Sequence, residues 1–287
     1  MSFVRALLDK FWSSRVWLPP NVTWADLEPN DKIAYTDYRH LGISLPFALA
    51  LLALRFALER YWFAPVGISL GIKNTKSKKA PPNAVLERAY LSKRKIRHKQ
   101  IVGLAKQVDM SERQVERWLR LRHSQDKPST LTKFCETCWR WLYYTFAFSY
   151  GVFCLWDKPW LWDVNHCWYD YPHQGITSDC WWYYMFSLAF YWSLAVSQFF
   201  DVKRKDFREM FIHHIATICL LGFSWVCNLH RIGTLVLLVH DVADVFLEAA
   251  KMMKYANYQR VCDVLFAIFT LVWITTRLGI YPVWLIH

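Results

Sequence analysis

The 287-residue chain is long enough for one membrane-embedded domain with a small appendage, and 54% of its residues are hydrophobic and 18% aromatic. Its net charge of +12 lies entirely in residues 72–133, which hold 17 Lys and Arg against 5 Asp and Glu, while the rest of the chain holds 18 of each kind. The eight cysteines show no compact disulfide framework, which excludes a disulfide-stapled scaffold. Beside membrane spans, such a basic block first indicates control of topology, ahead of binding to nucleic acid or an anionic surface.

The N-terminal segment, residues 1–41, has no apolar core after a basic start, so no cleavable signal peptide is expected. The first predicted transmembrane helix covers residues 42–62, and the basic block follows it. Because cytosolic flanks carry the excess of Lys and Arg, the segment 1–41 is predicted to be luminal and the basic block cytosolic. Asn21, in an Asn-Val-Thr sequon, then lies on the luminal side, where it can be glycosylated.

The basic block contains the pattern of a small helical unit. Residues 99–108 have helical apolar spacing, and Ser111 with Gln114 predicts a capping box that opens a second helix. That second helix is predicted to bury Val115, Trp118 and Leu119. We expect its arginines on the opposite face: Arg113, Arg117, Arg120 and Arg122.

The stretch VERWLRLRH in this second helix resembles the third helix of a homeodomain, with Trp118 as its core tryptophan. Leu121 occupies the position of that family's adenine-reading asparagine and cannot make its bidentate contact. We therefore expect residues 72–128 to form a cytosolic, partial homeobox-like domain that serves as a scaffold or faces anionic lipid, and DNA binding is not expected.

Five further apolar segments of about twenty residues are predicted to span the membrane, at 136–156, 181–200, 208–227, 231–250 and 258–280. Their connections alternate between basic and non-basic, as a multi-pass chain requires. Cys167 and Cys180 share one polar connection and could pair there. The predicted fold class is all-α: a polytopic transmembrane helix bundle of about six spans with a small cytosolic homeobox-like unit.

Two neighbouring spans carry ionisable side chains, each of which costs roughly 2.5–3.5 kcal/mol near the centre of a bilayer. These residues are His213 and His214 on the first span and His240, Asp241, Asp244 and Glu248 on the second. Adjacent helical residues point about 100° apart, so only one of the two histidines can face a pocket, whereas the three acids share one stripe. We interpret the cluster as a buried chemical site in which a carboxylate supports an imidazole. A divalent metal site and a purely structural polar cluster remain the alternatives.

The stretch FFDVKRKDFREMFIHHIATICLLGFSWVCNLHRIGTLVLLVHDVADVFLEAAKMMKY resembles the Lag1 motif of the ceramide synthases, within the larger TLC domain. RVWLPPNVTWADL at 15–27 and KPSTLTKFCETCWR at 127–140 are similar to the vertebrate, homeobox-bearing members. The resemblance implies a multi-pass enzyme of the endoplasmic reticulum membrane that joins fatty acyl-CoA to sphinganine or sphingosine. It implies no bound metal and no cofactor. It also implies contact with membrane lipid and a dimer of the chain with itself or with related synthases.

The family's essential histidine pair falls on His213 and His214, and its acidic positions fall on Asp241 and Asp244. The resemblance further suggests two auxiliary sets: Lys203, Arg204 and Lys205 for the phosphates of CoA, and His240 and Glu248 as supporting polar groups. The TLC domain is expected over residues 131–287 and, because family members continue with one more span, it is expected to be C-terminally incomplete, without the region that selects acyl-chain length. The alternative function is a non-catalytic membrane regulator whose basic unit binds lipid, a partner or DNA.

Overall fold

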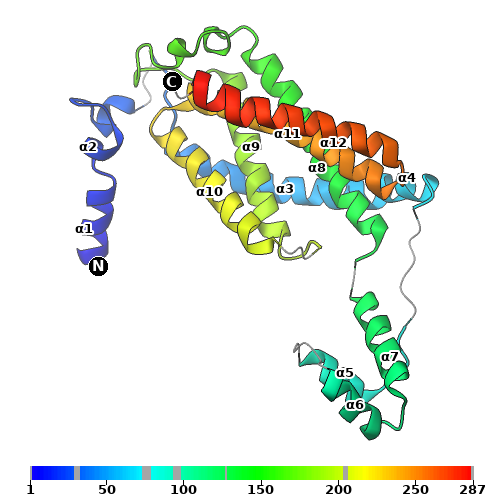
Figure 1. Cartoon of the computed structure of the whole chain (residues 1–287). Coiled ribbons are helices and arrows are strands. Elements are labelled where there is room, and N and C mark those ends of the chain that lie inside the picture. The colour runs from blue at the N-terminus through cyan, green and yellow to red at the C-terminus, as the bar shows by residue number, and fades with distance from the viewer. Residues whose placement is uncertain are drawn as a thin grey trace.

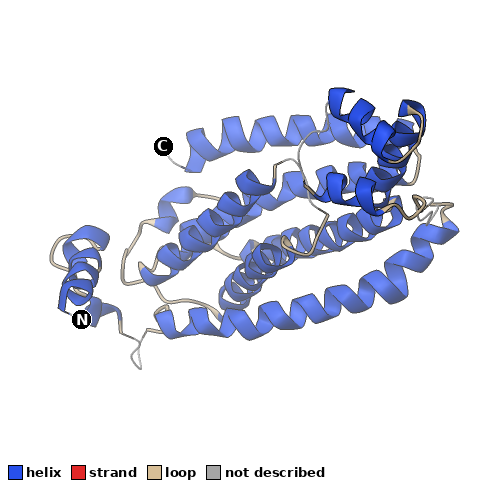
Figure 2. Ribbon diagram, turned by 90° about the horizontal axis from the view of Figure 1, so that it is seen from below, coloured by secondary structure: helices blue, strands red, loops and turns tan. Residues whose placement is uncertain are grey.

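The computed structural model describes residues 2–28, 33–72, 79–92, 98–126, 128–202 and 206–285, and these ranges are helical, without a strand (Figure 2). The all-α fold class is thereby confirmed. The N-terminal half contains α1 (Ser2–Phe11), α2 (Ser14–Trp17), α3 (Ser44–Leu58), α4 (Ala64–Ser69), α5 (Ala84–Leu91), α6 (His98–Gln107) and α7 (Glu112–Gln125). The second half contains α8 (Thr130–Leu155), α9 (Ser178–Ser197), α10 (Phe207–Val226), α11 (His230–Tyr255) and α12 (Gln259–Ile274).

The long helices form one bundle (Figure 1). Helix α11 packs along α8 and α12, while α9 packs against α3 and α10. π-helical turns over Glu59–Phe63 join α3 to α4, and another π-helical stretch, Thr275–Leu285, continues α12. The bundle core is strongly aromatic, and Tyr183, Tyr184 and Trp225 are among its fully buried side chains.

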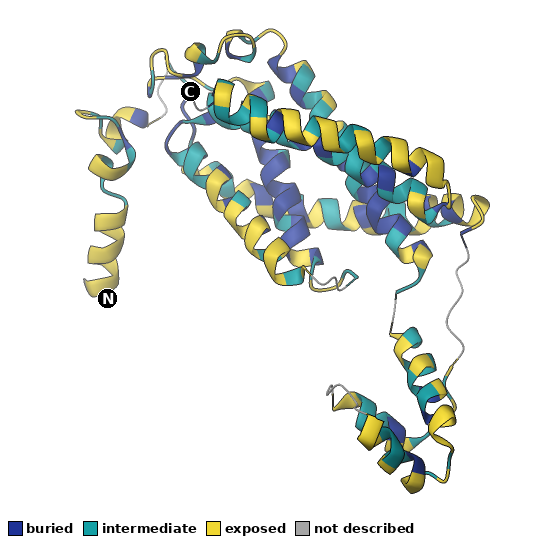
Figure 3. Cartoon of the chain, in the orientation of Figure 1, coloured by how far each residue is buried: buried dark blue, intermediate teal, exposed yellow. Residues whose placement is uncertain are grey.

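Each of the six predicted spans coincides with a long helix of this bundle. Within the described ranges, three stretches are long and apolar enough to cross a membrane: Tyr38–Ser69, Phe207–Val226 and Gln259–Leu285. The other three predicted spans are α8, α9 and α11. These helices carry many of the bundle's buried polar and aromatic side chains, which lowers their hydropathy, and α8 and α9 are largely covered by their neighbours (Figure 3).

Glycines allow two of the buried tyrosines to approach neighbouring helices closely. A Cβ atom on Gly233 of α11 would lie 1.7 Å from the hydroxyl oxygen of Tyr184, which is hydrogen-bonded to Ser224 at 2.7 Å. A Cβ atom on Gly151 of α8 would lie 2.7 Å from the hydroxyl oxygen of Tyr183. Small residues at helix contacts are the usual device for bringing membrane helices together.

Helices α5, α6 and α7 form a separate unit with its own small core of Leu86, Ala105, Val115 and Trp118 (Figure 1). The predicted capping box is confirmed: the Ser111 backbone N–H donates to Gln114 Oε1 at 2.8 Å, and the Gln114 N–H donates to Ser111 Oγ at 3.3 Å. Helix α5 completes the unit and was not among the predicted helices. The likeness of this unit to a homeodomain stays a prediction.

One predicted arginine faces inward rather than outward. Arg122 donates hydrogen bonds to Glu87 of α5 and to Asp126, and its guanidinium lies 4.9 Å from the ring centroid of Tyr90. The Arg122 hydrogen bond lowers the pKa of Asp126 below its ordinary value. Arg122 is therefore part of the packing between α5 and α7, and the prediction that it belongs to the exposed basic face is wrong.

The expected pairing of Cys167 with Cys180 is also not observed, because all eight cysteines are free. The Sγ atom of Cys180 lies 3.6 Å from that of Cys154, since α9 begins beside the end of α8. Cys167 is buried separately in the connection between these helices.

Candidate active site

The turn between α10 and α11 places the predicted site residues at one depth. His214 lies fourteen positions before Asn228 and Asp241 thirteen positions after it. With a rise of about 1.5 Å per residue, both lie roughly 20 Å along their helices from the turn. The short connection makes the two helices run in opposite directions, so the histidine pair and the acidic stripe begin at the same level of the bundle.

Asn228 holds this turn rigidly. Its backbone has φ of 56°, a left-handed value that asparagine tolerates better than most residues, and its side-chain amide donates to the carbonyls of Pro172 and Gln174 at 2.6 and 2.8 Å. The side-chain oxygen Oδ1 of Asn228 lies 3.1 Å from His230 Nδ1 and accepts a hydrogen bond from Thr36 Oγ1 at 3.2 Å. The ends of α10 and α11 are therefore fixed against the connection that precedes α9.

The two histidines of α10 point in different directions, as the helical geometry requires. His214 is buried, and its ring centroid lies 6.3 Å from that of Tyr191 on α9. His213 is exposed on the side of α10, with its ring centroid 5.7 Å from that of His214. Among the residues that the structure describes, His214 Nδ1 has no hydrogen-bond partner. His213 is thus accessible from outside the bundle, whereas His214 is enclosed in it.

Asp241 is buried and Asp244 is half-buried, and among the described residues neither has a counter-ion in contact. Asp241 is only 2% exposed and lies near enough to Tyr143 and Tyr183 to interact with them electrostatically. Asp244, one turn further, is its nearest charged neighbour on the same helix. Within the described ranges, neither carboxylate forms an ion pair, and neither is hydrogen-bonded to His213 or His214, so a direct His–Asp contact stays a prediction.

Glu248, at the end of the same stripe, has a different environment. Its Oε2 lies 3.3 Å from Arg140 Nε of α8, and its Oε1 accepts a hydrogen bond from Lys251 Nζ at 2.6 Å. Glu248 is therefore neutralised by two cations and joins α8 to α11. The expected supporting role of Glu248 in the site stays a prediction.

His240 and Arg277 form the wall of the site on the side of α12. The His240 Nδ1 lies 2.8 Å from the Val236 carbonyl, and the His240 ring packs edge-on against Tyr281 at 5.1 Å. Arg277, in the π-helical stretch, donates to the His240 carbonyl at 3.2 Å and interacts electrostatically with His213, Asp241 and Asp244. π-helical turns are frequent at functional sites, and this one places a cation beside the acidic stripe.

The residues predicted to meet CoA phosphates, Lys203, Arg204 and Lys205, lie outside the described residues. The chain just before them is anchored to two helices. Arg55 of α3 forms a bidentate pair with Asp201 at 2.6 and 3.0 Å, and the Val202 N–H donates to Glu136 of α8 at 3.0 Å. The described chain resumes at residue 206, directly before α10.

A metal site would bring several potential ligand atoms close to one another. In the described part of the chain, the group whose potential ligand atoms lie within 4.8 Å of one another is Cys154, Asp179 and Cys180, at the start of α9. The histidines and acids of α10 and α11 do not converge in this way. The expectation that this cluster holds no metal stays a prediction.

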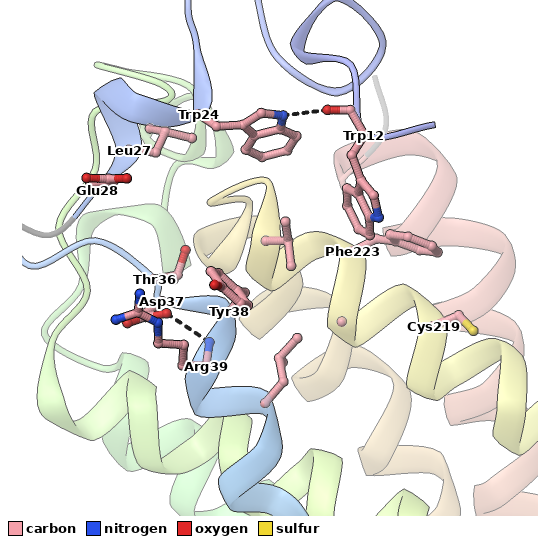
Figure 4. A pocket seen from close by; sticks show the side chains of 13 residues that line it. Trp12, Trp24, Leu27, Glu28, Thr36, Asp37, Tyr38, Arg39, Cys219 and Phe223 are labelled. Atoms are coloured by element: carbon pink, nitrogen blue, oxygen red, sulfur yellow. Dashed lines mark hydrogen bonds between the residues drawn. The ribbon is translucent and has the colours of Figure 1, made fainter. Parts of the chain in front are cut away.

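A cavity lies elsewhere, between the N-terminal segment and the end of α10 near the Asn228 turn (Figure 4). This groove of about 910 Å³ is lined by Trp12, Trp24, Arg39 and Phe223, among others, and by none of the residues of the polar cluster. Asn21 is exposed in the turn after α2, with φ of 67°. Its glycosylation stays a prediction.

Sequence reasoning missed Arg140, Arg277 and the buried tyrosines around Asp241. A signal for the arginines was present, because each lies inside a predicted span, where a cation is as costly as the acids that drew attention to α11. No comparable signal exists for the tyrosines, since aromatic residues are abundant along α8 and α9 and only packing shows which ones face the acids.

Comparisons with known proteins identify the family of the chain. Residues 133–287 match the TLC domain family. The chain is 48% identical to ceramide synthase 5 of Homo sapiens over 278 residues, which cover 96% of this chain and 71% of that protein. It is 45% identical to ceramide synthase 3 of Mus musculus, covering 96% and 72%, and 34% identical to ceramide synthase hyl-1 of Caenorhabditis elegans, covering 96% and 65%. The matched domain begins within α8 and includes both helices of the polar cluster.

Proposed function

Because the chain belongs to the ceramide synthase family, it is a sphingosine or sphinganine N-acyltransferase, and we propose that the polar cluster of α10 and α11 performs this reaction. The amine of the sphingoid base attacks the thioester carbonyl of a fatty acyl-CoA. A C–N bond forms, the C–S bond breaks, the amine loses a proton and CoA leaves as its thiol. The products are a ceramide or dihydroceramide and free CoA.

His213 is the proposed proton acceptor or nucleophile. Its ring is exposed beside α10, whereas His214 is held against Tyr191. As a base, His213 removes the proton from the attacking amine; as a nucleophile, it first takes the acyl group and then yields it to the amine. In either route, Asp241 and Asp244 stabilise the positive charge that develops on the imidazole.

One observation carries this assignment: among the residues that the structure describes, Asp241 and Asp244 have no ion-pair partner in contact, whereas Glu248, further along α11, has two. A structural cluster of charges would be expected to neutralise its members, as Arg140 and Lys251 neutralise Glu248 through ion pairs. Arg277 interacts electrostatically with His213 and Asp241, and its proposed role is to stabilise negative charge on the thioester oxygen during attack.

The proposed setting is the endoplasmic reticulum membrane, with the N-terminus in the lumen and acyl-CoA arriving from the cytosol. The basic residues Lys203, Arg204 and Lys205 precede α10, the helix that carries His213, and would attract the phosphates of CoA to that end of the bundle. The sphingoid base, being an amphiphile, reaches the same depth from the bilayer.

The test uses the purified, reconstituted protein, supplied with labelled acyl-CoA and sphinganine. His213→Ala and Asp241→Asn should each reduce turnover by about 10²-fold or more while the protein still elutes as a folded species. The matched control, Asp263→Asn, removes an exposed acid of α12 and should leave turnover unchanged. Normal ceramide formation by a His213→Ala, His214→Ala double variant would refute the proposed site.

A second measurement separates the two routes. Labelled acyl-CoA is added without sphingoid base, and the protein is analysed by mass spectrometry. A nucleophilic His213 should retain the acyl group until sphinganine is added, whereas a general base should retain none. Absence of acyl transfer by the unmodified protein would instead favour the alternative of a membrane regulator.

A further inference from the structure

Helix α1 divides cleanly into an apolar and a polar face. At about 100° per residue, its five large apolar residues fall within an arc of roughly 140°. These residues are Phe3, Val4, Leu7, Leu8 and Phe11. The opposite arc holds Arg5, Ala6, Asp9 and Lys10. This division is typical of a helix that lies at the boundary between an apolar and an aqueous phase.

The apolar face of α1 is not covered by the protein. Phe3 is 76% exposed, and the other four residues of the arc are 45–62% exposed. Isolated exposed apolar residues are common in proteins, but a continuous stripe on one helix marks an interaction surface.

The position of α1 indicates what covers this stripe. In Figure 1, α3 and α12 run from side to side, α8 and α10 run obliquely, and α9 runs nearly upright. Helix α1 lies outside this group of helices, beyond the end of the bundle where α10 and α11 are joined. An amphipathic helix at the end of the spans is expected at the depth of the lipid headgroups.

Aromatic contacts hold α1 at this level. Trp17, just after α1, stacks on Phe223 of α10 with ring centroids 4.9 Å apart and 13° between the planes. Phe11, at the end of α1, lies 6.1 Å from the same ring, and Trp24 Nε1 donates to the Trp12 carbonyl at 2.6 Å (Figure 4). Phe223 belongs to a helix long and apolar enough to span a membrane, and its neighbour Leu220 is 70% exposed. The apolar stripe of α1 therefore continues from the lipid-facing surface of α10.

We propose that α1 is an interfacial membrane helix: its apolar face enters the acyl chains of the leaflet on the side of the Asn228 turn. Arg5 and Lys10, at the opposite arc, face the aqueous side, where they attract lipid phosphates. The occupant of the exposed stripe is thus the bilayer itself. By fixing the N-terminal segment to the membrane plane, α1 also sets the position of the groove beside Phe223.

The experiment reconstitutes the purified chain in nanodiscs of phosphatidylcholine in which a fraction of the acyl chains carries a photoreactive diazirine. After irradiation, mass spectrometry maps the lipid adducts. Adducts are expected on the apolar residues of α1, with few on Arg5 or Asp9. In the Leu7→Glu variant, adducts on residues 2–11 should fall roughly tenfold, because a charged group replaces a buried leucine. The adjacent Ala6→Glu variant adds the same charge to the polar face and should retain them.

The labelling pattern of the unmodified protein tests the proposal even if a variant folds poorly. Adducts confined to the spans, with α1 unlabelled, would overturn it. So would equal labelling of both faces of α1, or covalent links between the α1 helices of two copies in place of lipid adducts. Similar adduct levels in Leu7→Glu and Ala6→Glu would likewise contradict an apolar face buried in lipid.

Discussion

The ion pair between Arg140 and Glu248 tests whether a charged residue of the bundle stabilises the fold or takes part in the reaction. Both side chains are largely buried, at 15% and 6% exposure, and their nearest atoms lie 3.3 Å apart. The substitution Glu248→Ala leaves the guanidinium of Arg140 between α8 and α11 without its nearest counter-ion. Removing one partner of a buried pair costs about 3–5 kcal/mol, because the remaining charge is uncompensated.

The surroundings of Arg140 place the expected loss of stability toward the lower end of that range. Arg140 still interacts electrostatically with Glu136 and Asp201, both on or near the same end of the bundle. Lys251, which is 29% exposed, loses its partner as well but can reach solvent. We therefore expect Glu248→Ala to lose about 3 kcal/mol of stability, whereas Arg140→Leu combined with Glu248→Leu should recover most of it, since neither charge remains.

Thermal unfolding of the detergent-solubilised protein, followed by size-exclusion chromatography, measures the stability change. Turnover is then measured per folded molecule. Glu248→Ala should unfold at a markedly lower temperature yet retain much of its activity at low temperature. Asp241→Asn should show the reverse, with near-normal unfolding and little turnover.

Two results would refute this reasoning. If Glu248→Ala were as stable as the unmodified protein, the pair would not be a significant buried interaction. If the Leu–Leu double variant were stable but as inactive as Asp241→Asn, Glu248 or Arg140 would belong to the chemistry.

The glycines, the sequon and the basic unit provide three further tests. Gly233→Ala, whose methyl group would overlap the hydroxyl of a buried tyrosine, should lose about 2–4 kcal/mol, whereas Gly222→Ala, with no atom within 4 Å, should unfold at nearly the same temperature. Asn21 should lose mass on glycosidase treatment, and a tag beside Lys79 should be digested by protease added to the cytosolic side; a protected tag would contradict the topology. The segment 72–133 should bind DNA weakly and with steep salt dependence, so a nanomolar, sequence-selective complex at physiological salt would support the regulator alternative.

Much of the helix order follows from local patterns in the sequence. Apolar segments of membrane length predict α3, α10 and α12, because their side chains face lipid and little else lowers their hydropathy. The start of α7 is equally local, since the Ser111 and Gln114 capping box needs only residues within one helical turn. Such features depend on neighbours in the sequence and could be predicted without the fold.

Features that depend on pairing between distant helices could not be predicted in this way. Helical geometry shows that His213 and His214 diverge, but only the packing of α10 against α9 determines that His214 is the buried one. Likewise, the spacing of Asp241 and Glu248 predicts a common stripe. It carries no information on Arg140, more than a hundred positions away, which neutralises one member and not the other.

Along one acidic stripe of α11, Glu248 is neutralised and Asp241 is not. This difference is the physical reason to propose that the reaction occurs at Asp241. An ionisable group in a span raises the free energy of the folded protein unless a partner offsets it, and Glu248 has two such partners in contact. Asp241, buried on the same face of the same helix, has none among the described residues, and the buried nitrogen of His214 at the same depth also has none. Because the neighbouring Glu248 shows that this bundle can neutralise a buried acid, the uncompensated groups are better explained by a need for free polar atoms at that depth. A reaction that moves a proton and stabilises transient charge has that need, whereas a scaffold would be more stable with apolar residues at both positions.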